Sequence, residues 1–407
     1  MKNHQTSYKE ALQLTLDQIQ PLFAEKVALL YLSGRVLAED IFSLADSPSA
    51  DASLRDGYAF QAADTASASP QHPICLQVEG FAAAGTPWKG KVTPGKATRI
   101  LTGAQLPKGA DTVVASEFTQ EEGNQVWVST ALNPGENILL KGSDVASGQP
   151  LFVAGKVLQP TNIGLLAAAG HSRVAVVKRP RVAIIATGDE VVSPGLPLKK
   201  GQLFASNLIA LSAWCVRYGM QITTSVVGDH TGDIGAMLAD SLSDHDAIIT
   251  IGGTWMGEHD LVIRSLDELV WKKVYHRVRM IPGKTVAFGV YRGKPVFCLP
   301  GGPPASHMAF LQLALPGLRK MAGYKNPQLP TLPTRLTETV NGTKDWTTFI
   351  PGRLETTVGE IHFRPLKISS RLQAISLSEA IIAIPEDTAQ FPAGAIIQAQ
   401  VWDWTEF

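Results

Sequence analysis

The chain has 407 residues, and 36 basic residues balance 36 acidic ones with no run of five like charges, which argues against a nucleic-acid partner. The length exceeds what one hydrophobic core serves, so roughly two to four domains are expected. Three widely spaced cysteines without a C-x-x-C pair exclude a disulfide framework and a zinc knuckle.

The amino-terminal residues predict helices in a cytoplasmic protein. Residues 1–20 lack the apolar core of a secretory signal, and no stretch approaches about 18 apolar residues, so no membrane partner is expected. Ser7 and Glu10 have the spacing of a capping box, and Pro21 closes the helix that follows. We also expect a helix over 33–41.

The rest of the chain changes character four times. Residues 45–141 contain short β-type runs and frequent glycines, which predicts a β-rich insertion. Residues 142–177 return to a mixed helical and β-type pattern, with a helix expected over 160–169. Whether they pack with the first helices is left open. Residues 178–326 alternate strands and helices, end in a hairpin around Arg292 and Gly293, and lead into a helix that Pro316 kinks. A linker over 326–333 precedes a small β domain.

These changes predict a multidomain α/β and β protein. The expected division is a mixed N-terminal domain (1–44 plus 142–177), the β-rich inserted domain (45–141), an α/β domain with a mostly parallel sheet (178–326) and a C-terminal β domain (327–407).

Two junctions in the α/β domain carry the chemistry: Thr187-Gly188-Asp189-Glu190 and the segment from Gly252 to Asp260. Each follows an expected buried strand, 182–186 or 247–251, and parallel sheets bind ligands beyond the carboxyl ends of their strands. Glycines there let backbone N–H groups approach phosphate oxygens.

The carboxylates of Glu190, Asp229 and Asp260 are the oxygen ligands that Mg²⁺ takes. The alternative interpretation is that Asp189 and Asp260 only cap the helices that follow them. The sequence leaves both interpretations open.

Other motifs fail. Gly283, Lys284 and Thr285 resemble the end of a phosphate-binding Walker A loop, but Val278 stands where that loop needs a glycine. No G-x-G-x-x-G follows a strand and no H-E-x-x-H is present, which argues against a dinucleotide enzyme and a zinc hydrolase.

A set of ordered motifs nevertheless resembles a known family, the molybdopterin molybdenumtransferases (MoeA and the gephyrin C-terminal domain). The motifs are Asp56-Gly57-Tyr58-Ala59, Leu101-Thr102-Gly103-Ala104, Gly109-Ala110-Asp111, Gly135-Glu136-Asn137, Thr187-Gly188-Asp189-Glu190 and Gly257-Glu258-His259-Asp260. The resemblance runs from about Ser33 to the end of the chain.

The resemblance implies a MogA-like fold for 178–326, a β-barrel-like C-terminal domain and a homodimer with its cleft formed across the two subunits. It implies insertion of molybdate into adenylylated molybdopterin with Mg²⁺ and release of AMP, and partners among other cofactor-biosynthesis proteins and acceptor molybdoenzymes. The implied catalytic residues are Asp56, Thr102, Glu190, Asp229 and Asp260, the last three also being Mg²⁺ ligands. The implied substrate-binding residues are Thr187, Gly188, Asp189, Gly252, Gly253, Trp255, Gly257, Glu258, Gly283, Lys284, Pro300, Gly301 and Pro303.

The chain departs from the family on the side that faces the substrate. Three polar family positions, a serine, a lysine and an asparagine, are Trp255, Ile281 and Gly302 here, and an unpaired buried polar group costs about 1–3 kcal/mol. Further departures are Ala205, Ala52 and Arg55. Three functions therefore stay open: insertion of molybdate or tungstate, a non-catalytic paralogue that binds a pterin or a partner protein, and nucleotide pyrophosphate cleavage.

Overall fold

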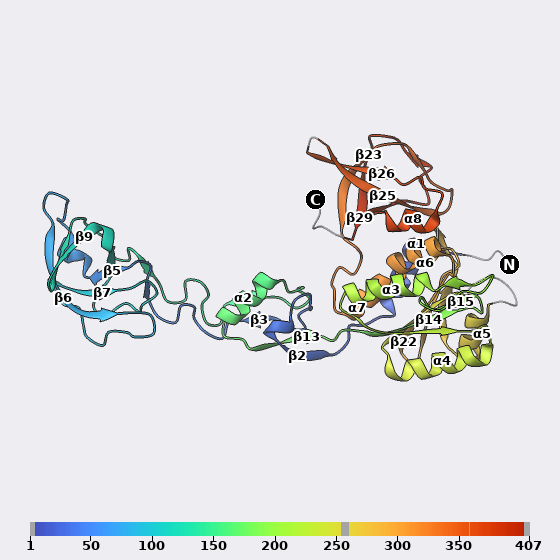
Figure 1. Ribbon diagram of the computed structural model, residues 1–407, viewed down its shortest axis with the longest axis horizontal. Helices are drawn as coiled ribbons and strands as arrows, with labels where there is room; N and C mark the ends of the chain where they lie inside the picture. Colours follow the sequence, from blue (N-terminus) through green and yellow to red (C-terminus); the bar gives the residue numbers. More distant parts are fainter. Residues whose placement is uncertain (1–4, 254–259, 358, 403–407) are drawn as a thin grey trace.

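The computed structural model describes residues 5–253, 260–357 and 359–402, and the chain is elongated (Figure 1). A β sheet formed by the insertion lies at one end of the molecule. The α/β part and the C-terminal β part lie together at the other end, and a small module that contains α2, β2, β3 and β13 lies between them. No helix within the described ranges is long and apolar enough to cross a membrane.

The α/β part is built on a six-stranded sheet. Its strands lie in the order β17 (Gln221–Val227), β14 (Arg181–Thr187), β18 (Ala247–Ile251), β22 (Lys294–Leu299), β21 (Ala287–Tyr291) and β19 (Lys272–His276). The first four strands are parallel, and β21 and β19 are antiparallel, so the expected mostly parallel sheet is confirmed. Residues 182–186 of β14 pair directly with 247–251 of β18, which brings the two glycine-bearing junctions to one edge.

Both faces of the central strands β14 and β18 are buried, which explains why these strands are continuous apolar runs. The covering helices are α1 (Tyr8–Asp17), α3 (Ser206–Arg217), α4 (Thr231–Asp244) and α5 (Leu261–Glu268). Val182 and Ile184 pack into the core that contains α1 and α3. Ala183 and Ile185 pack into the core that contains α4 and α5.

Helix α1 begins as its capping box predicts, because the Ser7 Oγ accepts a hydrogen bond of 3.2 Å from the Glu10 N–H. The long helical region after the hairpin consists of α6 (Pro303–Ala309), a π-helical turn (Phe310–Ala314) and α7 (Leu315–Met321). Pro316 lacks the N–H that a regular helix would use at that point, and the predicted irregularity takes the form of this π-helical turn.

The helix predicted over 33–41 is wrong. Val36 and Leu37 instead form isolated bridges to Val157 and Val176, and Gly34 has a φ of 73°. Pairing with residues distant in sequence therefore overrides the local helical pattern. The module that contains these residues consists of β2 (Ala24–Ala28), a 3₁₀ helix (Leu29–Tyr31), β3 (Ile41–Phe42), β12 (Pro150–Phe152), α2 (Pro160–Ala168) and β13 (Arg173–Val177).

The insertion forms a second six-stranded sheet. Its strands lie in the order β8 (Thr112–Ala115), β5 (Gly57–Phe60), β7 (Lys96–Ile100), β6 (Ile74–Ala82), β10 (Gln125–Val128) and β9 (Thr119–Glu122). Tyr58, Phe60 and Leu76 pack in the core on one side of it. Where the chain enters and leaves this sheet, β4 (Ala52–Ser53) pairs with β11 (Ile138–Leu139), and within the middle module β12 pairs with β3.

The C-terminal part is a small closed barrel, as the resemblance implies. Its strands are β23 (Thr331–Leu336), β25 (Thr347–Thr357), β26 (Glu360–Pro365), β27 (Ala380–Ile384) and β29 (Ile396–Val401), and α8 (Arg371–Ser376) follows β26. The ring closes because β25 pairs with both β26 and β27. Strand β23 begins inside the predicted linker, so the linker is shorter than expected. Strands β20 (Val278–Ile281) and β1 (Thr6–Ser7) extend this sheet.

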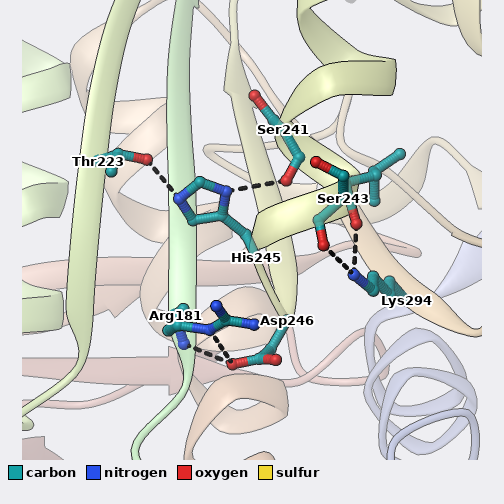
Figure 2. A network of polar contacts seen from close by, with 8 residues as sticks. Arg181, Thr223, Ser241, Ser243, His245, Asp246 and Lys294 are labelled. Atoms are coloured by element: carbon teal, nitrogen blue, oxygen red, sulfur yellow. Dashed lines mark hydrogen bonds and ion pairs between the residues drawn. The ribbon is translucent and has the colours of Figure 1, made fainter.

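At the amino ends of β14 and β18, polar contacts secure the sheet to α4 (Figure 2). The Arg181 backbone N–H donates to the Asp246 carboxylate at 2.8 Å. Lys294 donates to the carbonyls of Leu242 and Ser243, at the carboxyl end of α4. His245 contacts the Ser241 carbonyl at 2.8 Å, which completes the cap. This edge of the sheet is therefore structural, and the opposite edge is free to hold a ligand.

Candidate functional site

A cavity of about 1180 Å³ opens at the carboxyl ends of β14 and β18. That volume slightly exceeds the range of typical small-molecule sites, roughly 300–1,000 Å³. The predicted residues that line it are Thr187, Gly188, Glu190, Asp229, Gly252, Gly253, Gly283, Lys284, Pro300, Gly301 and Pro303. Trp255, Gly257 and Glu258 lie outside the described residues, so the structure does not place them.

The acidic side of the cavity is formed by Glu190 and Asp229, which follow β14 and β17. Gly188, with a φ of 140°, lets the Glu190 carboxylate fold back over the backbone, because a Cβ there would lie 2.7 Å from Glu190 Oε2. Asp189 does not line the cavity; its Oδ1 accepts a hydrogen bond of 3.0 Å from the Asp229 N–H. Asp189 thus orders the loop that carries Asp229, and it caps no helix.

The opposite wall is backbone. Gly252 has a φ of 101°, and a Cβ there would lie 2.8 Å from the Thr187 carbonyl oxygen. A Cβ added to Gly253 would likewise lie 2.7 Å from Val262 Cγ2. The Asn207 amide donates to the Gly301 carbonyl at 2.7 Å and ties the start of α3 to the loop after β22. The wall is therefore held in place, and only glycine fits it.

Asp260 does not line the cavity within the described residues. It occupies the N-cap position of α5 without a well-formed capping hydrogen bond, although the N–H of Ile263 in the first turn acts on its carboxylate. Its Oδ2 lies 3.8 Å from His276 Nε2, too far for a hydrogen bond, and both Asp260 Oδ1 and His276 Nε2 are buried without a partner.

The surroundings shift both groups towards their neutral forms. Burial raises the pKa of Asp260 to about 6, although the Ile263 N–H opposes the shift. Burial, together with the charges of Arg277 and Lys273, lowers the pKa of His276. The sequence did not predict that His276 lies beside Asp260, because His276 ends β19 whereas Asp260 precedes α5.

Asp56 and Thr102 form a second polar site. The Thr102 backbone N–H and hydroxyl both donate to Asp56 Oδ1, at 2.7 and 2.8 Å, and these bonds lower the pKa of Asp56. Asp56 directly precedes β5, and Thr102 follows β7. These strands lie at one end of the elongated molecule, and β14 lies at the other end (Figure 1). One chain alone therefore does not bring Asp56 and Thr102 to Glu190.

Arg371 and Leu372, at the start of α8, are cavity residues that the sequence did not predict. They reach the cavity because α8 of the barrel packs against α6. No motif or spacing marks them, since their role depends on how two separate parts of the chain pack. Within the described parts of the chain, no group of three or more His, Cys, Asp or Glu side chains is placed to hold a metal ion.

The comparisons with known proteins agree along nearly the whole chain. Residues 6–170 match the MoeA N-terminal region (domain I and II), residues 183–320 match a probable molybdopterin binding domain, and residues 333–402 match the MoeA C-terminal region (domain IV).

Individual relatives show the same likeness. The sequence is 33% identical over 385 residues to molybdopterin molybdenumtransferase 2 of Mycobacterium tuberculosis, covering 93% of this chain and 95% of that protein. It is 30% identical over 396 residues to molybdopterin molybdenumtransferase of Staphylococcus aureus, covering 97% and 94%. The crystal structure of molybdopterin biosynthesis moeA protein from Pyrococcus horikosii aligns with a TM-score of 0.86 at 30% identity, covering 98% of this chain and all of that one.

Proposed function

Because the chain belongs to the MoeA family of molybdopterin molybdenumtransferases, we propose that its cavity binds adenylylated molybdopterin and that AMP leaves when molybdate, or a related oxyanion such as tungstate, is inserted. The protein is a transferase of molybdenum cofactor biosynthesis and performs MoeA-type molybdenum insertion. The non-catalytic alternative is not favoured. One observation carries the proposal for the site: Glu190 and Asp229 face a glycine wall in one large cavity.

The donor set fits Mg²⁺, which takes one or two carboxylates together with water and phosphate oxygens. Glu190 and Asp229 would hold the ion from the cavity side, whereas Asp260 lies outside the cavity lining, beside His276, and is not part of this set. When bound, Mg²⁺ polarises the phosphoanhydride and offsets charge on the departing AMP.

The chain's own groups position the substrate. Gly252 and Gly253 let backbone N–H groups approach phosphate oxygens closely. Lys284 is exposed at the cavity and offers a positive charge to the same oxygens. Ile281, Gly302 and Ala205 also line the cavity, so three positions that are polar in the family present apolar surface here.

We further propose a homodimer in which Asp56 and Thr102 of one subunit complete the cavity of the other. The separation of β5 and β7, which Asp56 and Thr102 flank, from β14, which Glu190 follows, supports this arrangement (Figure 1). Large apolar side chains exposed on the middle module also support it, since such surface is usually covered: Phe23 is 88% exposed and Leu30 90% exposed.

The four-domain division, the cytoplasmic location and interactions with other cofactor-biosynthesis proteins and acceptor molybdoenzymes belong to the same proposal. Helix α1 packs on the central sheet rather than on the middle module, and it would belong functionally to the α/β domain.

The test is release of AMP from adenylylated molybdopterin in the presence of Mg²⁺ and molybdate. Glu190→Gln and Asp229→Asn should each lower the rate by about 10- to 100-fold, as loss of a metal ligand or its support does. Asp240→Ala, on the exposed face of α4, serves as the matched control and should keep the full rate. Background release from the unmodified protein would reject the proposal, and release from simple dinucleotides without a pterin would indicate pyrophosphate cleavage instead.

A further inference from the structure

The C-terminal barrel contributes a cation to the cavity. Arg371 and Leu372 begin α8, and both line the cavity although its other residues belong to 186–305. Helix α8 packs against α6, whose first turn supplies Pro303 and Ala305 to the same cavity. Arg371 is therefore held at the cavity by contact between two parts of the fold.

The guanidinium of Arg371 is exposed and has no hydrogen bond or ion pair among the residues that the structure describes. Its neighbours in the barrel are engaged: Arg364 binds Glu355, Arg335 binds Glu360, and Arg353 donates to the Leu377 carbonyl. Arg371 is thus the barrel arginine that is available to a ligand in the cavity.

The charges of the cavity show what such a ligand is. Among the residues that the structure describes, its ionisable lining residues are Glu190 and Asp229 on one side, with Lys284 and Arg371 as the cations. Ile281, which stands where the family usually has a lysine, also lines the cavity and offers no charge. Without Arg371, Lys284 would be the single cation that the described part of the lining offers to an anionic ligand.

We infer that Arg371 acts with Lys284 as a second cation of this cavity, and that it binds a tetrahedral oxyanion, either the phosphate of an adenylyl group or molybdate. This inference rests on the proposed function. The planar guanidinium can form two parallel hydrogen bonds to such an oxyanion, which an ammonium group cannot. The bound anion would then join the barrel to the central sheet.

Equilibrium dialysis of the full chain tests the inference without turnover. One arm uses AMP, measured by chromatography, and the other uses molybdate, measured by elemental mass spectrometry. Arg371→Met should weaken binding by about 10- to 100-fold in at least one arm, as loss of a charged hydrogen bond does. Arg371→Lys should retain part of the affinity, and a loss in only one arm identifies which oxyanion Arg371 contacts.

A second variant returns a positive charge to the cavity at a different position. Ile281→Lys in the Arg371→Met background should restore most of the lost affinity, because it returns a cation to the same cavity. Arg364→Met is the matched control; it removes a barrel arginine that pairs with Glu355 and should bind both probes as the unmodified protein does.

Unchanged binding of both probes by Arg371→Met would overturn the inference, as would failure of the unmodified protein to bind either probe. Absence of AMP release with normal, Arg371-dependent binding would count against the proposed function alone. The two failures are therefore distinguishable.

Discussion

Gly252 shows how tightly the cavity wall is built. Its φ is 101°, and a methyl carbon added there would lie 2.8 Å from the Thr187 carbonyl oxygen, which leaves no room for a side chain. Gly252→Ala should lower the free energy of unfolding by about 2 kcal/mol or more, because it combines an unfavourable backbone conformation with a clash against backbone. Urea denaturation measures the change.

Gly302→Ala is the control for that substitution. Gly302 has a φ of −68°, and no atom lies within 4 Å of an added Cβ. Its unfolding free energy should stay within about 0.5 kcal/mol of the parent. Equal effects at Gly252 and Gly302 would contradict the described wall.

Asp260 should make stability depend on pH. Its pKa is raised by burial from 3.8 to about 6, so the folded state favours the protonated carboxyl, and stability is lost as the pH rises through about 6. In the presence of a chelator, Asp260→Asn should be more stable than the parent at about pH 8, by up to about 1 kcal/mol after allowance for solvent screening. At about pH 4.5 the two proteins should differ little.

Calorimetric melting at both pH values decides this prediction. A difference between Asp260→Asn and the parent that is the same at both pH values would show that the carboxyl does not titrate in this range. Asp240→Asn, on the exposed face of α4, should match the parent throughout.

Single residues of the site were predictable where chemistry follows directly from a strand. Glu190 and Gly252 come straight after β14 and β18, and the pairing of these strands brings both to the cavity. Arg371 was not predictable, since its place depends on packing of α8 against α6. Asp260 shares a motif with cavity residues but is placed beside His276 instead.

At the scale of elements, local signals succeeded where the local residues decide the structure. The Ser7 hydroxyl caps α1 as predicted, and the β-branched runs of β14 and β18 are strands. The segment over 33–41 failed because its partners, Val157 and Val176, lie more than a hundred residues away in the chain. A helical pattern carries no information about such partners.

The carboxyl end of α4 depends on one lysine. Lys294 of β22 donates to the carbonyls of Leu242 and Ser243, which belong to the last turn of α4 and have no partner within the helix itself (Figure 2). Lys294→Met should lower the free energy of unfolding by about 1–2 kcal/mol, because it removes charged hydrogen bonds at the negative end of the helix dipole. Chemical denaturation followed by circular dichroism measures the loss.

Lys199→Met is the comparison for that substitution, because Lys199 is exposed and its side chain has no polar partner within the described ranges. It should leave the unfolding free energy unchanged. A comparable loss from both substitutions would mean that the cap at α4 contributes nothing specific.

At the scale of the whole molecule, the distance between the two polar sites predicts complementation between subunits. Asp56→Ala and Glu190→Gln alone should each release AMP at no more than about a tenth of the parent rate. When the two variants are co-expressed, about half of the dimers should be mixed and each should hold one complete site, which gives about a quarter of the parent activity. AMP release by the purified mixture measures this.

The control is a mixture of Glu190→Gln with Asp229→Asn, whose changes affect the same cavity and leave no complete site in any pairing. Recovery in that mixture, or none in the first, would contradict a cavity completed by the partner subunit. Sequence pattern alone could not locate the two sites relative to each other, because the chain crosses the middle module between them.

The three cysteines are divided between the two ends of this elongated chain. Cys75 is half-buried on β6 of the insertion, whereas Cys215 on α3 and Cys298 on β22 are fully buried, and burial raises the pKa of both of these thiols to about 12. Thiolates are the species that alkylating reagents attack. The three cysteines should consequently be alkylated at different rates. Labelling of Cys75 reports opening of the inserted sheet, and labelling of Cys215 and Cys298 reports opening of the α/β part separately.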